Sequence, residues 1–141
     1  MAADDPFNLQ RFVDAQASVY ERVRAELRNG RKQSHWMWFI FPQIAGLGHS
    51  AMAQRYAISS LREAEAYLKH PVLGPRLREC TRLMLRVEGK SAHDILGSPD
   101  DLKFHSSLTL FARAAPDGDV FTAALDKYYD GRDDEQTLAR L

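Results

Sequence analysis

An unbroken run of six large apolar residues, WMWFIF at residues 36–41, constrains this chain more than any other feature. Both tryptophans of the protein lie in the run, and a protein in water must either bury such a stretch or use it for binding. A continuous run has no period, so it fits a buried strand as well as two turns of a buried helix. Ser34 before the run can cap a helix and Pro42 after it can stop one, so the two flanks favour the short helix.

Helical periodicity and capping signals divide the rest of the chain. Apolar residues at three-and-four spacing predict one amphipathic helix over residues 8–29, and Gly30 follows where a left-handed C-cap belongs. Ser60 with Glu63 forms a capping box that opens a helix over residues 61–69. Between residues 43 and 49, two glycines indicate a loop.

A heptad-like apolar stripe predicts a longer helix from about residue 72 or 75 to residue 87. Shorter helices are expected at residues 50–57, at residues 91–96, from Phe121 through Tyr128 up to Gly131, and after a capping box of Asp133 and Gln136. The chain shows no internal repeat and no linker. The sum is an all-α fold, a single domain over residues 1–141 with about eight mostly short helices.

Residues 98–115 carry two conflicting patterns. Ser98 as a cap, Pro99 at the first helical position and the aspartates that follow favour a helix. Apolar residues also alternate with polar ones from Leu102 to Ala112, which is typical of a strand. The start signals lead us to expect a helix, and the alternation leaves the strand open.

Charge, cysteine content and hydropathy argue against several classes of protein. Lys plus Arg equals Asp plus Glu at 19 each, so the formal net charge is zero and binding of nucleic acid by bulk phosphate neutralisation is not expected. Cys80 is the only cysteine, so no intrachain disulfide can form. No apolar run approaches the ~20 residues that span a bilayer, and the N-terminus has no signal-peptide core. We therefore expect a cytoplasmic protein that binds neither a membrane nor a nucleic acid.

Motifs for metal and cofactor binding are missing from the sequence. The five histidines show no HxH or HxxxH spacing, and the single cysteine has no partner. The chain also contains no GxGxxG or GxxxxGK[ST] phosphate loop and no GxSxG nucleophile elbow. We expect no metal and no cofactor.

Polar residues around the apolar run form a first candidate block. Indole rings of Trp36 and Trp38 offer flat faces to a nucleobase or ribose, and Gln43 can both donate and accept in orienting it. Lys32 and His35 would add charge and proton transfer. The alternative is that the rings form the core and that Gln43 only holds the loop backbone.

A second block follows the predicted helix start near residue 99. Lys103 can pair with Asp100 three residues earlier, face a ligand phosphate or carboxylate, or, if desolvated, attack a sugar carbon as a nucleophile. Hydroxyl groups of Ser106 and Ser107 suit polar ligand contacts, although helical serines also bond back to the preceding turn. Asp101 would join this block, with favourable placement in the first helical turn as the simpler explanation.

Glu79, at the edge of the long helix's apolar stripe, is the third candidate. If it borders a pocket, partial burial would raise its pKa and suit it to general acid or base catalysis. The alternative is an ordinary ion pair with a neighbouring arginine, namely Arg76, Arg78 or Arg82. Cys80, on the stripe itself, is expected to be a buried, inert thiol.

Five segments of the chain resemble successive blocks of the domain-of-unknown-function 1810 family: DPFNLQRFVDAQ, HWMWFIFPQIAGLG, YAISSLREAEAYLKHPVLGPRLRECT, PDDLKFHSSLTLF and LDKYYDGRDDEQTL. This resemblance covers nearly the whole chain and implies a small, mainly helical bacterial protein. It implies no established activity. A more distant resemblance to NADAR-type enzymes implies an N-glycosidase acting on ADP-ribose adducts or related ribosyl amines, but no NADAR motif matches residue by residue and no catalytic role is transferred.

Two hypotheses for function follow. The first is a nucleotide- or ADP-ribose-like small-molecule binder or an N-glycosidase-type hydrolase, with a pocket between residues 36–43 and residues 101–107. Its catalytic candidates are Lys103, Glu79 and His35. Its ligand-binding candidates are Lys32, Trp36, Trp38, Gln43, Asp101, Ser106 and Ser107. The alternative is a non-catalytic helical interaction or regulatory domain that docks a partner through an exposed patch of Trp38, Phe39 or Tyr128 and Tyr129. The sequence does not specify an oligomeric state.

Overall fold

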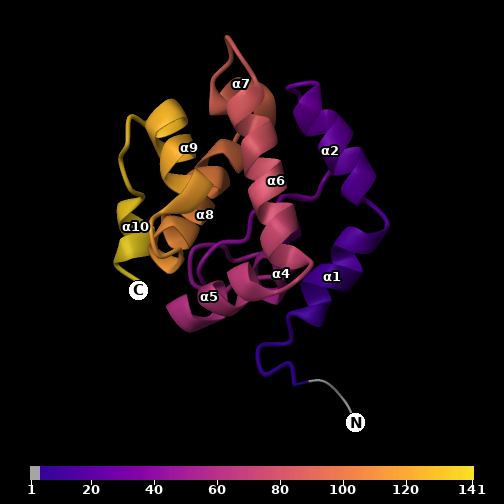
Figure 1. The fold of residues 1–141 in the computed structure, drawn as a ribbon, viewed down its shortest axis with the longest axis vertical. Helices are drawn as coiled ribbons and strands as arrows, with labels where there is room; N and C mark the ends of the chain where they lie inside the picture. The colour runs from indigo at the N-terminus through magenta and orange to yellow at the C-terminus, as the bar shows by residue number, and fades with distance from the viewer. Residues whose placement is uncertain (1–3) are drawn as a thin grey trace.

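Ten α-helices follow one another in the computed structural model, which describes residues 4–141, and no strand is formed in that part of the chain (Figure 1). They are α1 Gln10–Ala17, α2 Tyr20–Arg28, α3 Met37–Ile40, α4 Ala51–Arg55, α5 Leu61–Lys69, α6 Leu73–Arg86, α7 Ala92–Leu96, α8 Asp100–Ala114, α9 Asp119–Tyr129 and α10 Glu135–Leu138. The predicted all-α fold of mostly short helices is confirmed. Within these residues, no helix is long and apolar enough to cross a membrane.

The single helix predicted over residues 8–29 is wrong, because α1 and α2 are separated by a turn at Ser18 and Val19 (Figure 1). The Val19 N–H donates to the Gln16 carbonyl, three residues back, at 3.1 Å. Such a turn nearly preserves the helical advance, so the apolar spacing continues across the break and hides it. Gln16 is buried, and its amide donates to the Phe39 carbonyl at 2.7 Å and to the Tyr67 hydroxyl at 3.2 Å.

The helix at the centre of the packing is α8, which contacts α5, α7, α9 and α10. The strand alternative for this segment is excluded. Between Phe104 and Phe111, every residue except His105 is buried, so α8 is covered on nearly all sides. A helix buried all round carries no clear 3.6-residue period, which explains why alternation was visible in its sequence.

A chain of aromatic contacts connects four of the helices through the core. Phe12 on α1 packs edge-on against Tyr67 on α5, with ring centroids 5.1 Å apart. Tyr67 contacts Phe111 on α8 at 5.3 Å, and Phe111 contacts Phe121 on α9 at 5.9 Å. These distances are typical of favourable aromatic pairs, so the contacts add to the burial of the rings.

The apolar run at residues 36–41 forms the four-residue helix α3, so the predicted short helix is confirmed. The predicted cap at Ser34 is wrong, because Trp36 is the N-cap residue and the Ser34 hydroxyl bonds Glu26 instead. Five of the six residues of the run are buried, and Trp38 is the half-buried exception. Phe41 packs edge-on against Phe104 of α8, with ring centroids 4.8 Å apart. Most of the run is therefore core, and it seats the loop that follows Pro42 against α8.

Local capping explains why several helix boundaries match the prediction. The Ser60 hydroxyl accepts from the Glu63 N–H at 3.2 Å and starts α5 at Leu61, and α5 ends at Lys69 as expected. The Glu63 carboxylate bonds the Ser59 N–H at 2.8 Å, one residue before the cap. Ser91 starts α7 in a full capping box. Ser98 makes no side-chain cap to α8, whose N-cap residue is Pro99.

Candidate functional site

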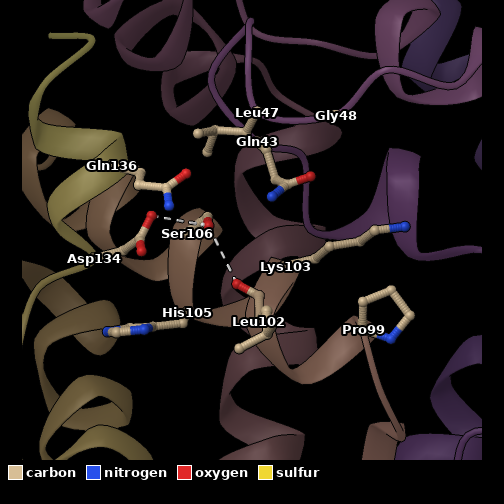
Figure 2. Close-up of a pocket in the computed structure, with 10 residues that line it drawn as sticks. All are labelled: Gln43, Leu47, Gly48, Pro99, Leu102, Lys103, His105, Ser106, Asp134 and Gln136. Atoms are coloured by element: carbon tan, nitrogen blue, oxygen red, sulfur yellow. Dashed lines mark hydrogen bonds between the residues drawn. The ribbon is translucent and has the colours of Figure 1, made fainter.

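A cleft of about 410 Å³ lies between the loop after α3, the first turns of α8 and the start of α10 (Figure 2). Three of the candidate residues line this cleft: Gln43 from the loop, and Lys103 and Ser106 from α8. The remaining lining residues are Leu47, Gly48, Pro99, Leu102, His105, Asp134 and Gln136. The cleft thus has polar groups on both sides and apolar side chains between them.

The loop that carries Gln43 is held in place at both of its ends. An isolated parallel bridge joins Ile44 to Ile58, in which the Ile58 N–H donates to the Gln43 carbonyl at 2.8 Å. Gly48 lies so close to α4 that an added Cβ would stand 2.5 Å from the Cβ of Ala53. A larger residue at this position would push the loop away from α4, so glycine sets the position of this wall of the cleft.

Asp134 forms the opposite wall and fixes α10 to α8. Its Oδ2 atom accepts from the Thr137 N–H at 3.1 Å and the Thr137 hydroxyl at 2.6 Å, and it caps α10. The same atom accepts from the Ser106 hydroxyl at 3.1 Å (Figure 2). The Asp134 N–H donates to Thr109 Oγ1 at 2.8 Å. The predicted cap at Asp133 is wrong by one residue, because Asp133 pairs instead with Arg113 at 2.8 Å.

Lys103 belongs to a cluster of two lysines around one aspartate. The Lys32 ammonium lies 2.8 Å from Oδ2 of Asp100, and the Lys103 ammonium lies 3.8 Å from Oδ1 of the same carboxylate. Each ammonium also sits 5.2 Å from the centroid of an indole ring, Lys32 over Trp36 and Lys103 over Trp38. Figure 2 shows the Lys103 side chain extending along the cleft, with its amine directed away from Asp134.

Trp36 is a core residue with only 1% of its surface exposed, so it offers no face to a ligand in this structure. Its indole N–H donates to Oε1 of the buried Glu26 at 2.9 Å. The N–H groups of Gln33 and Ser34 also bond Oε1, at 2.7 and 3.0 Å, and the Ser34 hydroxyl bonds Oε2 at 2.6 Å. Burial raises the pKa of Glu26, but these hydrogen bonds outweigh it and lower the pKa to about 2.

Asp101 and Ser107 lie outside the cleft lining. The Asp101 carboxylate faces His93 on α7, with Oδ2 3.5 Å from Nδ1, and its backbone carbonyl accepts from the Tyr129 hydroxyl at 2.5 Å. Burial raises the pKa of Tyr129, which keeps that hydroxyl a donor. Ser107, on α8, is buried in the protein core. Trp38 stands near the cleft through its contact with Lys103 and does not line it.

Glu79 and His35 are also absent from the cleft lining. Glu79 accepts from the Tyr20 hydroxyl at 2.5 Å and lies 3.2 Å from Nε of Arg24, so its ion-pair partner comes from α2 and not from its own helix. Burial is the main cause that raises the pKa of Tyr20. His35 is exposed. Cys80 is buried, and burial raises the pKa of its thiol to about 12.

The side chains of His105, Ser106 and Asp134 lie in one cleft but are not arranged as a catalytic triad. A ring nitrogen of His105 bonds the Arg132 carbonyl at 2.8 Å, and the ring stacks on Tyr129 with centroids 4.1 Å apart. Ser106 bonds Asp134 directly, without a histidine between them. Within residues 4–141, no group of three or more His, Cys, Asp or Glu side chains is placed to hold a metal ion.

Comparison with known proteins agrees with this fold. Residues 6–141 match the family described as "Protein of unknown function (DUF1810)". The chain belongs to this family. The crystal structure of the conserved hypothetical protein Rv1873 from Mycobacterium tuberculosis is 60% identical in sequence and superposes with a TM-score of 0.96, covering 97% of this chain and 98% of that one. No curated protein matches the chain. The resemblance drawn from five sequence segments is therefore confirmed.

The aromatic residues of the interaction hypothesis lie on two helices of this DUF1810 protein, α3 and α9. Phe39 is buried, whereas Trp38, Tyr128 and Tyr129 are partly buried. Tyr128 and Tyr129 also donate their hydroxyls to the carbonyls of Met84 and Asp101. Among the residues that the structure describes, the most exposed large apolar side chain is Leu102, at 61%, in the lining of the cleft. Chemically, the cleft combines an apolar rim with amides, one carboxylate and one ammonium group.

Proposed function

We propose that this DUF1810 protein binds a small molecule that resembles a nucleotide or ADP-ribose. The binding site is the cleft between the loop that carries Gln43, α8 and α10. One observation carries the proposal: Gln43, Lys103, Ser106, Asp134 and Gln136 come from three parts of the chain and line the same cleft. Its volume of about 410 Å³ lies within the range of about 300–1,000 Å³ that is usual for ligand pockets.

The lining suits the parts of such a ligand. The side-chain amides of Gln43 and Gln136 can each donate and accept hydrogen bonds at the polar edge of a nucleobase. Leu47 and Leu102 supply the apolar contact that a planar ring requires. The Asp134 carboxylate can accept from sugar hydroxyls, and the hydrogen bonds from Thr137 and Ser106 hold it in position.

Hydrolysis of an N-glycosidic bond is the second candidate, and the Asp134 carboxylate favours it. A carboxylate in the wall of a cleft can take a proton from water as the water oxygen bonds to the sugar carbon and the carbon–nitrogen bond breaks. The carboxyl group then passes this proton to the departing nitrogen, which restores the carboxylate. All hydrogen bonds to this carboxylate from residues 4–141 go to Oδ2. Oδ1 would therefore be the atom that contacts the water.

A thermal-shift screen tests the binding proposal. The panel contains nucleosides, nucleotides, ADP-ribose and sugar phosphates, because a ligand that binds only the folded state raises the unfolding midpoint by mass action. Gln43→Ala should abolish or reduce the shift. Gln10→Ala is the matched control, because Gln10 is an exposed glutamine bonded only locally to Asp14. If no compound shifts the wild-type midpoint, the proposal fails.

The hydrolase candidate has its own test in Asp134→Asn. Asparagine is also a good N-cap, so the fold of α10 should persist. If the protein is an N-glycosidase, this variant should bind the ligand identified in the screen and no longer release its sugar, as followed by chromatography. Equal turnover in the variant and the wild type would exclude Asp134 as the catalytic carboxylate.

We expect this activity in the cytoplasm of a bacterium. Cys80 is a buried free cysteine, so the fold depends on no oxidising compartment. The partner would be a small molecule and not a membrane or a nucleic acid. The oligomeric state is left open.

A further inference from the structure

The cluster of Lys32, Asp100 and Lys103 has more positive than negative charge. Both ammonium groups approach a single carboxylate, Lys32 at 2.8 Å and Lys103 at 3.8 Å. Asp101, the next residue, is directed to His93 and forms no ion pair with either lysine among residues 4–141. With both lysines protonated and Asp100 ionised, the cluster has a net charge of about +1.

Partial burial strengthens the electrostatic effect of this excess charge. The exposed side-chain fractions of Lys32, Asp100 and Lys103 are 8%, 18% and 22%, so water and salt screen these charges less than charges on the open surface. Lys32 is the more buried lysine and the closer partner of Asp100. Lys103 is therefore the weakly paired cation, and it is the one that lines the cleft.

The Lys103 ammonium group is also positioned by its contact with Trp38. This group lies 5.2 Å from the centroid of the Trp38 ring, a distance at which a cation is attracted to an indole face. The side chain runs along the cleft away from Asp134, so the negative and positive groups of the cleft lie apart (Figure 2). A ligand that complements both ends carries hydrogen-bond donors at one end and an anionic group at the other.

We propose that Lys103 receives an anionic group of the ligand, a phosphate or carboxylate, which neutralises the excess charge of the Lys32–Asp100–Lys103 cluster. This inference rests on the proposed function and narrows it: the ligand is a phosphorylated or carboxylated compound and not a neutral nucleoside. Lys32 is a positioning residue that occupies Asp100 and leaves Lys103 for the ligand.

The probes are inorganic phosphate, adenosine and adenosine 5′-monophosphate, followed by NMR. The Lys103 and Trp38 side-chain signals report the anion end, and the side-chain amides of Gln43 and Gln136 report the rest of the cleft. Phosphate should give a saturable shift at Lys103 and Trp38 relative to chloride of equal ionic strength. Adenosine 5′-monophosphate should bind about tenfold more tightly than adenosine, because a hydrogen bond to a charged group exceeds a neutral one.

Variants assign the effect to Lys103. In Lys103→Met the phosphate response and the tenfold preference should disappear, whereas Lys69→Met, a change at an exposed lysine on α5, should keep both. Equal affinity for adenosine and its monophosphate in the wild type would overturn this inference and leave the proposed function standing. A phosphate response without any nucleoside response at the Gln43 and Gln136 amides would support the anion site and count against a nucleotide-like ligand. No saturable phosphate response would overturn the inference.

Discussion

Trp36 lies between two groups of charged side chains, one buried and one partly buried, that differ in how completely the protein itself pairs their charges. On the indole N–H side, the Glu26 carboxylate accepts hydrogen bonds from Gln33, Ser34 and the indole itself. Over the ring face, Lys32 shares the Asp100 carboxylate with Lys103. The first group is complete within the protein and serves the fold. The second has two ammonium groups for one carboxylate and borders the cleft, and it is the place where we propose that a ligand binds.

The largest expected effect on stability comes from substitution of Glu26, whose carboxylate is fully hydrogen-bonded within the protein. Glu26→Ala should lower the free energy of unfolding by about 3 kcal/mol, because several buried donors would lose their acceptor at once. Glu26→Gln, which keeps one acceptor oxygen, should lower it by about half as much. Urea unfolding followed by tryptophan fluorescence measures both. Equal losses in the two variants would mean that the hydrogen bonds do not determine the effect.

Glu26 should also make stability depend on pH in the acid range. Its pKa in the folded protein, about 2, lies below the ordinary value of 4.5, so the ionised form stabilises the fold above pH 4.5. This contribution is lost as the pH falls from 4.5 through 2. Unfolding free energies of wild type and Glu26→Gln, measured between these pH values, should therefore converge as the pH falls. A constant difference would contradict the low pKa.

Substitution of the two tryptophans should also affect stability to different extents, with the larger loss at Trp36, which bonds Glu26. Trp36→Phe should lower the free energy of unfolding by about 2 kcal/mol, because it removes the indole N–H from Glu26 and leaves a gap in the core. Trp38→Phe should change it by about 0.5 kcal/mol or less, since Trp38 is only partly buried and a phenyl ring can still face Lys103. Thermal unfolding of the two variants makes the comparison, and equal losses would contradict it.

Much of the fold could be predicted because helix starts are local. Ser60 and Ser91 act on N–H groups three residues away, so the starts of α5 and α7 are visible in the sequence. The turn between α1 and α2 leaves no signal in the sequence, because it preserves the apolar spacing. At the start of α10 the sequence does not distinguish Asp133 from Asp134, because either aspartate can cap a helix. The contacts of Asp134 with Thr137 and Ser106 select Asp134.

The candidate site was only partly predictable for a similar reason. Gln43, Lys103 and Ser106 could be selected as polar residues beside apolar ones. Glu79 could not be placed, because its partners Tyr20 and Arg24 are more than fifty residues away. Long-range pairings of this kind leave no period or spacing in the sequence. The ion pair of Lys32 with Asp100 on α8 is likewise a long-range contact that forms only in the fold.

The smallest expected effects on stability distinguish the two lysines. Lys32→Met should lower the free energy of unfolding by about 1 kcal/mol, because Asp100 loses its close partner in a partly buried place. Lys103→Met should change it by about 0.5 kcal/mol or less, and can raise it, because one of two repelling cations is removed. Chemical denaturation at low salt measures both. A larger loss in Lys103→Met than in Lys32→Met would show that Lys103 serves the fold.

The most direct test of the central claim is the NMR response of the Gln43 and Gln136 side-chain amides to the panel of nucleosides, nucleotides, ADP-ribose and sugar phosphates. The account predicts that at least one compound shifts both amides saturably with a single dissociation constant, while the amide of Gln10 on α1 stays unchanged. If no compound shifts Gln43 and Gln136, or if Gln10 responds equally, the cleft is not the ligand site.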